Sequence, residues 1–99
     1  MNEHAGVVRL VRHDPGTGRR DEVAGVLKAM AEAARDAPGC FGAQVATSDR
    51  DGETLVLISR WESAEAMNHF GDDPGFASLR DQLKESVSKQ PDVEVLTTA

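Results

Sequence analysis

The sequence predicts an α+β fold in which an antiparallel sheet carries helices on one face. Three observations predict it. Strand-like and helix-like segments follow one another in the order strand, helix, strand, strand, split helix, strand. The third strand is apolar on both of its faces, and clusters of turn-forming residues separate the segments at short intervals. This order is that of a ferredoxin-like βαββαβ domain.

The first two elements are a strand and a long helix. Val7–Val11 is rich in β-branched residues and stops at a cluster of turn formers, Asp14–Gly18. Apolar residues then recur at helical spacing over Asp21–Asp36, with acidic residues in the first turn. Pro38 and Gly39 end this helix.

Two strands joined by a tight turn come next. The alternating pattern of Cys40–Thr47 predicts three apolar side chains on one face: Phe41, Ala43 and Val45. Asp49–Gly52 forms the turn, and Leu55–Trp61 is the returning strand. Because this strand is apolar on both faces, it belongs in the middle of the sheet.

A split helix and a strand complete the chain. Ser63 is predicted to cap a short helix, Ala64–Phe70, which Gly71 ends. Asp73 is predicted to cap a second helix, which opens at Pro74. The apolar stripe of this helix has four members: Phe76, Leu79, Leu83 and Val87. Val93–Thr97 is the last strand.

The composition predicts one small domain over residues 1–99, with residues 1–5 as a frayed terminus. Only 39% of the 99 residues are hydrophobic and 4% are aromatic, so the core is thin. No segment is left to cover the second face of the sheet. A second copy of the chain is the economical cover, and we therefore expect a homodimer.

Charge and motifs exclude several classes of function. A net charge of -6 argues against nucleic acid and against anionic membrane surfaces as partners. No apolar run approaches the roughly 18–20 residues of a membrane span, and no signal peptide opens the chain. The single cysteine, Cys40, suits a small buried position and a reducing cytoplasm. The histidines have no metal-ligand spacing and no cofactor motif is present, so neither metal nor cofactor is expected.

Two motifs lie on either side of the predicted hairpin: Ala37–Gly42 before it, and Trp61–Ala66 after it with Pro74 and Phe76 beyond. With the spacing of the elements, they resemble the antibiotic-biosynthesis monooxygenase family of dimeric α/β barrels, over nearly the whole chain. That family includes cofactor-free oxygenases that turn aromatic polyketides or hydroquinones into quinones, haem-degrading oxygenases, and chains with no known reaction.

The resemblance disfavours the haem-degrading branch. Those relatives have a Trp where this chain has Phe70, a His where it has Arg80, and an Asn on the first strand, which Val7–Arg12 lacks. A haem-binding protein is therefore a distant third hypothesis.

The quinone-forming branch fits better, because Trp61 and Arg80 match its pattern. The resemblance implies that Arg80 stabilises a substrate anion and that Trp61 forms an aromatic wall, both as catalytic residues. Three further residues are implied to bind the substrate: Leu57, Met67 and Phe70. Polar residues of those relatives are replaced here by Met67, Leu57 and Ala46, and no general base is evident. The implied partners are a small phenolic or anthrone-type molecule and dioxygen.

A second hypothesis from another class stays open: a non-catalytic dimer that binds a small apolar ligand or serves as an accessory fold. The residues themselves allow it. Arg80 borders an apolar stripe, so its stem could cover the core with its head in water. Trp61, Met67 and Phe70 could equally be core residues, Trp61 with a hydrogen-bond partner.

Overall fold

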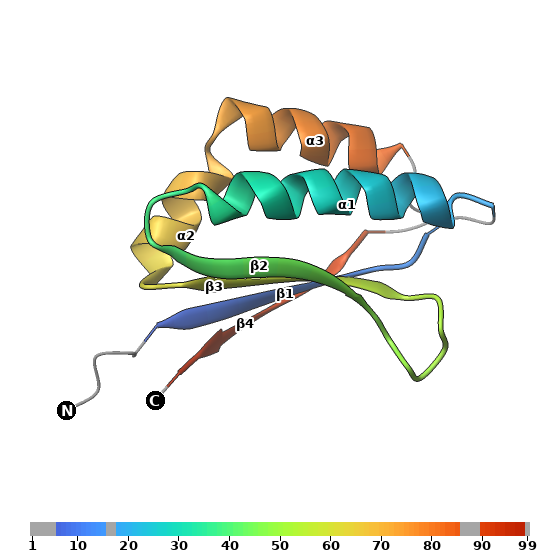
Figure 1. Ribbon diagram of the computed structural model, residues 1–99, viewed down its shortest axis with the longest axis horizontal. Coiled ribbons are helices and arrows are strands. Elements are labelled where there is room, and N and C mark those ends of the chain that lie inside the picture. The colour runs from blue at the N-terminus through green and yellow to red at the C-terminus, as the bar shows by residue number, and fades with distance from the viewer. Residues whose placement is uncertain (1–5, 16–17, 86–89, 99) are drawn as a thin grey trace.

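In the described residues of the computed structural model, which are 6–15, 18–85 and 90–98, four antiparallel strands form one layer and three helices form the other (Figure 1). The strands are β1 (Val7–His13), β2 (Cys40–Thr47), β3 (Leu55–Trp61) and β4 (Asp92–Thr97). The helices are α1 (Arg20–Arg35), α2 (Ala64–Gly71) and α3 (Pro74–Lys84). The strand order in the sheet is β2-β3-β1-β4.

The predicted ferredoxin-like order of elements is confirmed, including the interior position of β3. Several bounds differ from the prediction by one or two residues. β1 continues beyond Val11 to His13, α1 and β4 each begin one residue earlier, and α1 ends one residue earlier. Gly71 is the last residue of α2 rather than the residue that breaks it. Val87, predicted in the stripe of α3, and residues 1–5, predicted to fray, lie outside the described residues. No helix in the described ranges is long and apolar enough to cross a membrane.

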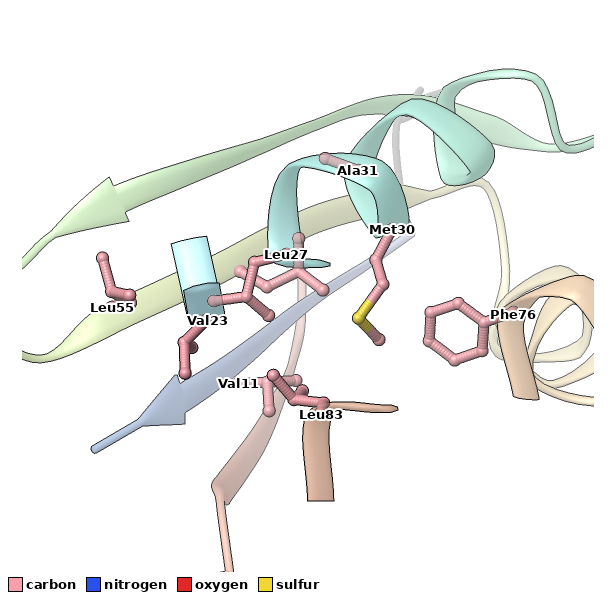
Figure 2. Packing of buried hydrophobic residues seen from close by; sticks show 9 residues of the cluster. Val11, Val23, Leu27, Met30, Ala31, Leu55, Phe76 and Leu83 are labelled. Carbon is pink, nitrogen blue, oxygen red and sulfur yellow. The ribbon is translucent and has the colours of Figure 1, made fainter. Parts of the chain in front are cut away.

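The apolar stripe of α1 joins the helical layer to the sheet. Its buried members are Val23, Leu27, Met30, Ala31 and Ala34. The first four share a core with β1, β3 and α3, and Ala34 packs with Val7 and Trp61. Figure 2 shows Met30 extending from α1 toward Phe76 of α3. Complete burial of a Val or Leu side chain contributes roughly 1.5–3 kcal/mol, so α1 supplies much of the stability of the domain.

A side-chain cap begins each of the helices α2 and α3, as predicted. The Ser63 hydroxyl accepts a hydrogen bond from the Ala66 N–H at 3.1 Å, and the Asp73 carboxylate accepts one from the Phe76 N–H at 3.0 Å. Each cap satisfies a backbone donor that the first helical turn leaves unpaired. Because Asp73 begins a new helix two residues after Gly71, the chain turns sharply between α2 and α3.

The prediction that Phe41 shares a face with Ala43 and Val45 is wrong. Cys40 lies opposite Trp61 while Gly42 lies opposite Arg60, so Phe41 is an extra residue in a β-bulge. The extra residue breaks the alternation of the strand. The Phe41 side chain is consequently 63% exposed, and the neighbouring Cys40, expected to be buried, is half-buried.

All three helices lie on one face of the sheet, and no described element covers the other face (Figure 1). On this outer face Leu10 lies opposite Ile58, and Val8 lies opposite Leu96. Leu96 is exposed, and the other three side chains are only partly buried. We use "outer face" below for these four residues with Val56.

Gly39 connects the start of the β2–β3 hairpin to the start of α2. Its φ of +83° is in the left-handed region, and a Cβ at this position would lie 2.7 Å from both the Ala66 Cβ and a Glu62 carboxylate oxygen. Its carbonyl oxygen also accepts a hydrogen bond from the Glu62 N–H at 2.8 Å. Glycine is required here both for the backbone conformation and for space.

Substitution Gly39→Ala should lower the free energy of unfolding by about 2 kcal/mol, because the backbone is strained and Ala66 must move. The matched control is Gly25→Ala on α1, where a Cβ meets nothing within 4 Å. That variant should gain about 0.5–1 kcal/mol from helix propensity. Urea unfolding measures both. Equal stability of Gly39→Ala and the parent would contradict the constraint.

Candidate functional site

The five residues predicted for the site line one cavity between the sheet and the helices α2 and α3. They are Leu57, Trp61, Met67, Phe70 and Arg80. The cavity has a volume of about 390 Å³ and also receives side chains from β1 and α1. We call it the aromatic cavity. Ala46, one of the positions where quinone-forming relatives are polar, pairs with Val56 on the outer face and does not line it.

The alternation of β3 positions the floor of the aromatic cavity. Leu57, Ser59 and Trp61 point to the helical side of the sheet, and all three are buried. The Trp61 indole N–H donates a hydrogen bond to the Ser59 hydroxyl at 2.9 Å. Trp61 therefore both packs in the core, with 2% of its surface exposed, and lines the cavity with its polar atom satisfied.

A row of three aromatic rings forms one wall of the cavity. The Trp61 and Phe70 ring centroids are 5.3 Å apart, and those of Phe70 and Phe76 are 4.6 Å apart, with tilted planes in both pairs. Such offset aromatic contacts are favourable because ring edges and faces carry opposite partial charge. Phe70, in the middle, is only partly buried, so its ring remains available to a ligand.

Arg80 closes the row at the exposed end. The centre of its guanidinium lies 5.7 Å from the Phe76 ring centroid, within the range of a cation–π contact. One Nη lies 3.5 Å from the Gly71 carbonyl oxygen, at the outer limit of a hydrogen bond. The side chain is exposed overall and lines the cavity.

A second cavity of about 500 Å³ adjoins the first one, toward β4. Its lining includes the β1 residues Val11 and His13, and Val93 of β4; we call it the edge cavity. The two cavities share five lining residues: Arg9, Met30, Leu57, Phe76 and Arg80. They are therefore two lobes on either side of the same side chains.

Arg9 and His13 are lining residues that the sequence reasoning missed. Val7 and Val11 are buried on the helical side of β1, and the period of a strand places Arg9 and His13 on that same side. This alternation was the signal that could have found them. Burial and the neighbouring positive charge of Arg80 lower the pKa of Arg9 from its usual value, although an arginine stays protonated at neutral pH.

His13 is the most deeply buried polar side chain at these cavities. It is 2% exposed, and neither ring nitrogen has a hydrogen-bond partner among the described residues. Burial in apolar surroundings and the positive charge of Arg9 lower the pKa of His13 to about 4. The imidazole is consequently neutral at pH 7.

The other polar groups at the two cavities are few. Asp72 lines the aromatic cavity and is exposed, as is Asn68 beside it. His69 is exposed and lines neither cavity. Among the described residues, no three His, Cys, Asp or Glu side chains come close enough to hold a metal ion.

The chain belongs to the antibiotic biosynthesis monooxygenase family, whose model matches residues 6–82. No curated protein matches the sequence significantly. Among solved structures, Rv0793 from Mycobacterium tuberculosis is 28% identical with a TM-score of 0.86, and the match covers 94% of each chain.

Two structures with lower sequence identity show the same fold. SnoaB from Streptomyces nogalater, a cofactor-independent oxygenase, is 18% identical with a TM-score of 0.81, over 94% of this chain and 92% of its own. A conserved protein from Methanosarcina mazei is 13% identical with a TM-score of 0.90, over 99% of this chain and 97% of its own. The predicted family and fold are thereby confirmed.

The neutral, unpartnered His13 predicts a pH-dependent stability. In the unfolded chain the pKa of the imidazole is near its ordinary value of 6.5, whereas in the folded chain this pKa is about 4. As the pH falls from about 6.5 to about 4, the unfolded chain binds a proton that the folded chain does not bind. The free energy of unfolding therefore falls by up to about 3 kcal/mol.

Urea unfolding of the parent and of His13→Gln across this pH range measures the effect. The variant should show a shallower loss of stability toward acid, because its side chain does not titrate. His69→Gln, on the exposed side of α2, is the matched control and should retain the parent's slope. Identical slopes in His13→Gln and the parent would contradict the assignment.

Proposed function

We propose that this protein is a homodimeric, cofactor-independent monooxygenase that oxidises a phenolic or anthrone-type aromatic, polyketide-like molecule, or a hydroquinone, to a quinone in the aromatic cavity. The observation that carries the proposal is the row of Trp61, Phe70 and Phe76 with Arg80 at its end, in a chain of the monooxygenase family. A flat ring system fits against such a wall, and its ionised oxygen fits beside the guanidinium.

The proposed chemistry uses the substrate as its own source of electrons. A phenol or anthrone that loses a proton becomes an electron-rich anion, and this anion transfers an electron to dioxygen. The two radicals combine at a ring carbon to form a peroxide. For a phenol or an anthrone, loss of water from the peroxide leaves one oxygen atom as the quinone carbonyl, while the other oxygen departs in the water. A hydroquinone already carries both oxygens, so it would give two electrons and two protons to dioxygen, which departs as hydrogen peroxide.

The residues of the cavity would favour the anion and exclude water. Arg80 cannot lose its charge, so it would stabilise the phenolate or enolate and lower the pKa of the bound substrate. Met67 and Leu57 are apolar, and Leu57 is buried, which keeps the reacting carbon in a dry environment. With the substrate acidified by Arg80, its proton would pass to water at the cavity mouth.

The outer face supports the proposed homodimer. Its apolar side chains extend across β3, β1 and β4, and the exposed Phe41 adds to the apolar surface of the chain. An apolar sheet face of this kind is a typical interaction surface. A second copy of the chain, placed face to face, would bury it as an isologous interface.

The non-catalytic ligand-binding function remains the competing hypothesis. The observation that favours it is the absence, among the described lining residues of the aromatic cavity, of a histidine or lysine that could act as a base. The same experiment separates the two functions.

Oxygen uptake with anthrones and hydroquinones, without added flavin, haem or metal, tests the activity. We expect uptake well above spontaneous autoxidation, and a loss of at least about a hundredfold in Arg80→Ala, the order observed when one charge-stabilising donor is removed. Arg35→Ala on α1, which lines neither cavity, should keep the parent's rate. Uptake no faster than autoxidation across the panel would favour the ligand-binding function.

Sedimentation equilibrium tests the homodimer. The parent should sediment as a dimer, and Ile58→Glu should shift it to monomer, because a carboxylate would be buried unpaired at the interface. Ser78→Glu on α3, an exposed position, should remain dimeric. A parent that sediments as a monomer at all concentrations would contradict the proposal.

A further inference from the structure

The two cavities differ in charge. Arg9 and Arg80 line both. Asp72 lines only the aromatic cavity and offsets part of their charge there, whereas Lys84, whose ammonium lies 3.9 Å from an Asp81 carboxylate oxygen, lines only the edge cavity. No carboxylate is among the described residues that line the edge cavity. The positive charge is therefore concentrated where the edge cavity meets the aromatic cavity.

No carboxylate of the described residues pairs with the positive charge at this junction. Among the described residues neither Arg9 nor Arg80 forms an ion pair. Arg12, on the opposite face of the same strand, has carboxylate oxygens of Glu94 at 3.3 Å and Asp92 at 3.6 Å. Described carboxylates therefore pair with Arg12, and none of them pairs with Arg9. A partly buried, unpaired guanidinium is unfavourable unless a ligand pairs with it.

His13 gives a second, independent observation at the same place. It is a polar side chain, almost completely buried, that lines the edge cavity and has no hydrogen-bond partner among the described residues. Buried polar groups are nearly always paired. The edge cavity therefore contains unsatisfied polar groups of two kinds, cationic and neutral, between apolar walls that include Val11 and Leu83.

We propose that the two cavities together bind an aromatic carboxylate, with its rings along Trp61 and Phe70 and its carboxylate at the junction, between Arg9 and Arg80. This inference rests on the proposed function and specifies its substrate class. A phenolate formed in place needs one cation, which Arg80 provides. The second cation, Arg9, then indicates a group that is already ionised in solution.

The form of the cavity favours a carboxylate over a phosphate. A carboxylate is planar and accepts paired hydrogen bonds from guanidinium groups. It carries a single charge and is less strongly hydrated than a phosphate dianion, which suits the apolar lining of Val11, Leu83 and Val93. Pairing with Arg9 would also offset the positive charge that acts on His13.

Calorimetric titration with 2-naphthoate and 2-naphthamide tests the proposal, because the two probes share a shape and differ in charge. The parent should bind 2-naphthoate at least about tenfold more tightly, the size of one hydrogen bond to a charged group. In Arg9→Gln the preference should fall to about threefold or less. Arg9→Lys retains the charge and should recover most of the preference for 2-naphthoate.

Arg12→Gln is the matched control, since it removes an arginine from the other face of the same strand; its preference should equal the parent's. Thermal unfolding of each variant verifies the fold, and Arg80→Gln on the exposed surface of α3 provides the same test if Arg9→Gln does not fold. Equal binding of the two probes by the parent would overturn the proposal, as would an unchanged preference in Arg9→Gln.

The outcomes are distinguishable from those of the oxygen-uptake experiment. A carboxylate preference that depends on Arg9, with no oxygen uptake, would support the anion site and reject the monooxygenase. Turnover of neutral anthrones by a protein that binds the two probes equally would overturn the anion site and leave the monooxygenase standing.

Discussion

The packing of α1 on β2 and β3 is the interaction on which the rest of the structure depends. The small and branched side chains of α1 bring this helix close to one half of the sheet, and α3 then packs against α1. The helical layer consequently covers β2 and β3 and leaves β4 largely uncovered on the same side; Val93 is 48% exposed there. The two cavities lie in the space that this asymmetric cover leaves between the sheet and the helices α2 and α3.

The polar side chains that line these cavities include three from the strands β1 and β3. The period-two alternation of β1 carries Arg9 and His13 inward among valines, and that of β3 carries Ser59 inward beside Trp61. Among the described residues, Ser59 and Trp61 form a hydrogen bond with each other, whereas the ring nitrogens of His13 have no hydrogen-bond partner. The domain therefore retains an arginine and a histidine in a costly environment, which is the arrangement expected where a ligand supplies the missing partner.

Much of the fold could be predicted from the residues alone, and the five residues that the family resemblance implied for the site line one cavity. The stripe of α1, the caps Ser63 and Asp73, and the two-faced β3 are local patterns with direct physical causes, and the structure confirms them. Phe41 was misplaced because a β-bulge depends on how two strands pair, which alternation within one strand does not reveal. Arg9 was missed although its alternation with Val7 and Val11 was visible, because a charged residue in a short strand is ordinarily solvated.

By itself the sequence determined the order of the elements, their ends and the apolar faces, since helix and strand periods, caps and turns act between near neighbours in the chain. It also carried the two motifs by which the family resemblance could be seen. Only the tertiary structure decided that Trp61, Phe70, Phe76 and Arg80 form one row, and that Arg9 shares a cavity with Arg80. Those contacts join β1, β3, α2 and α3, whose relative positions follow from core packing across the whole domain rather than from local spacing.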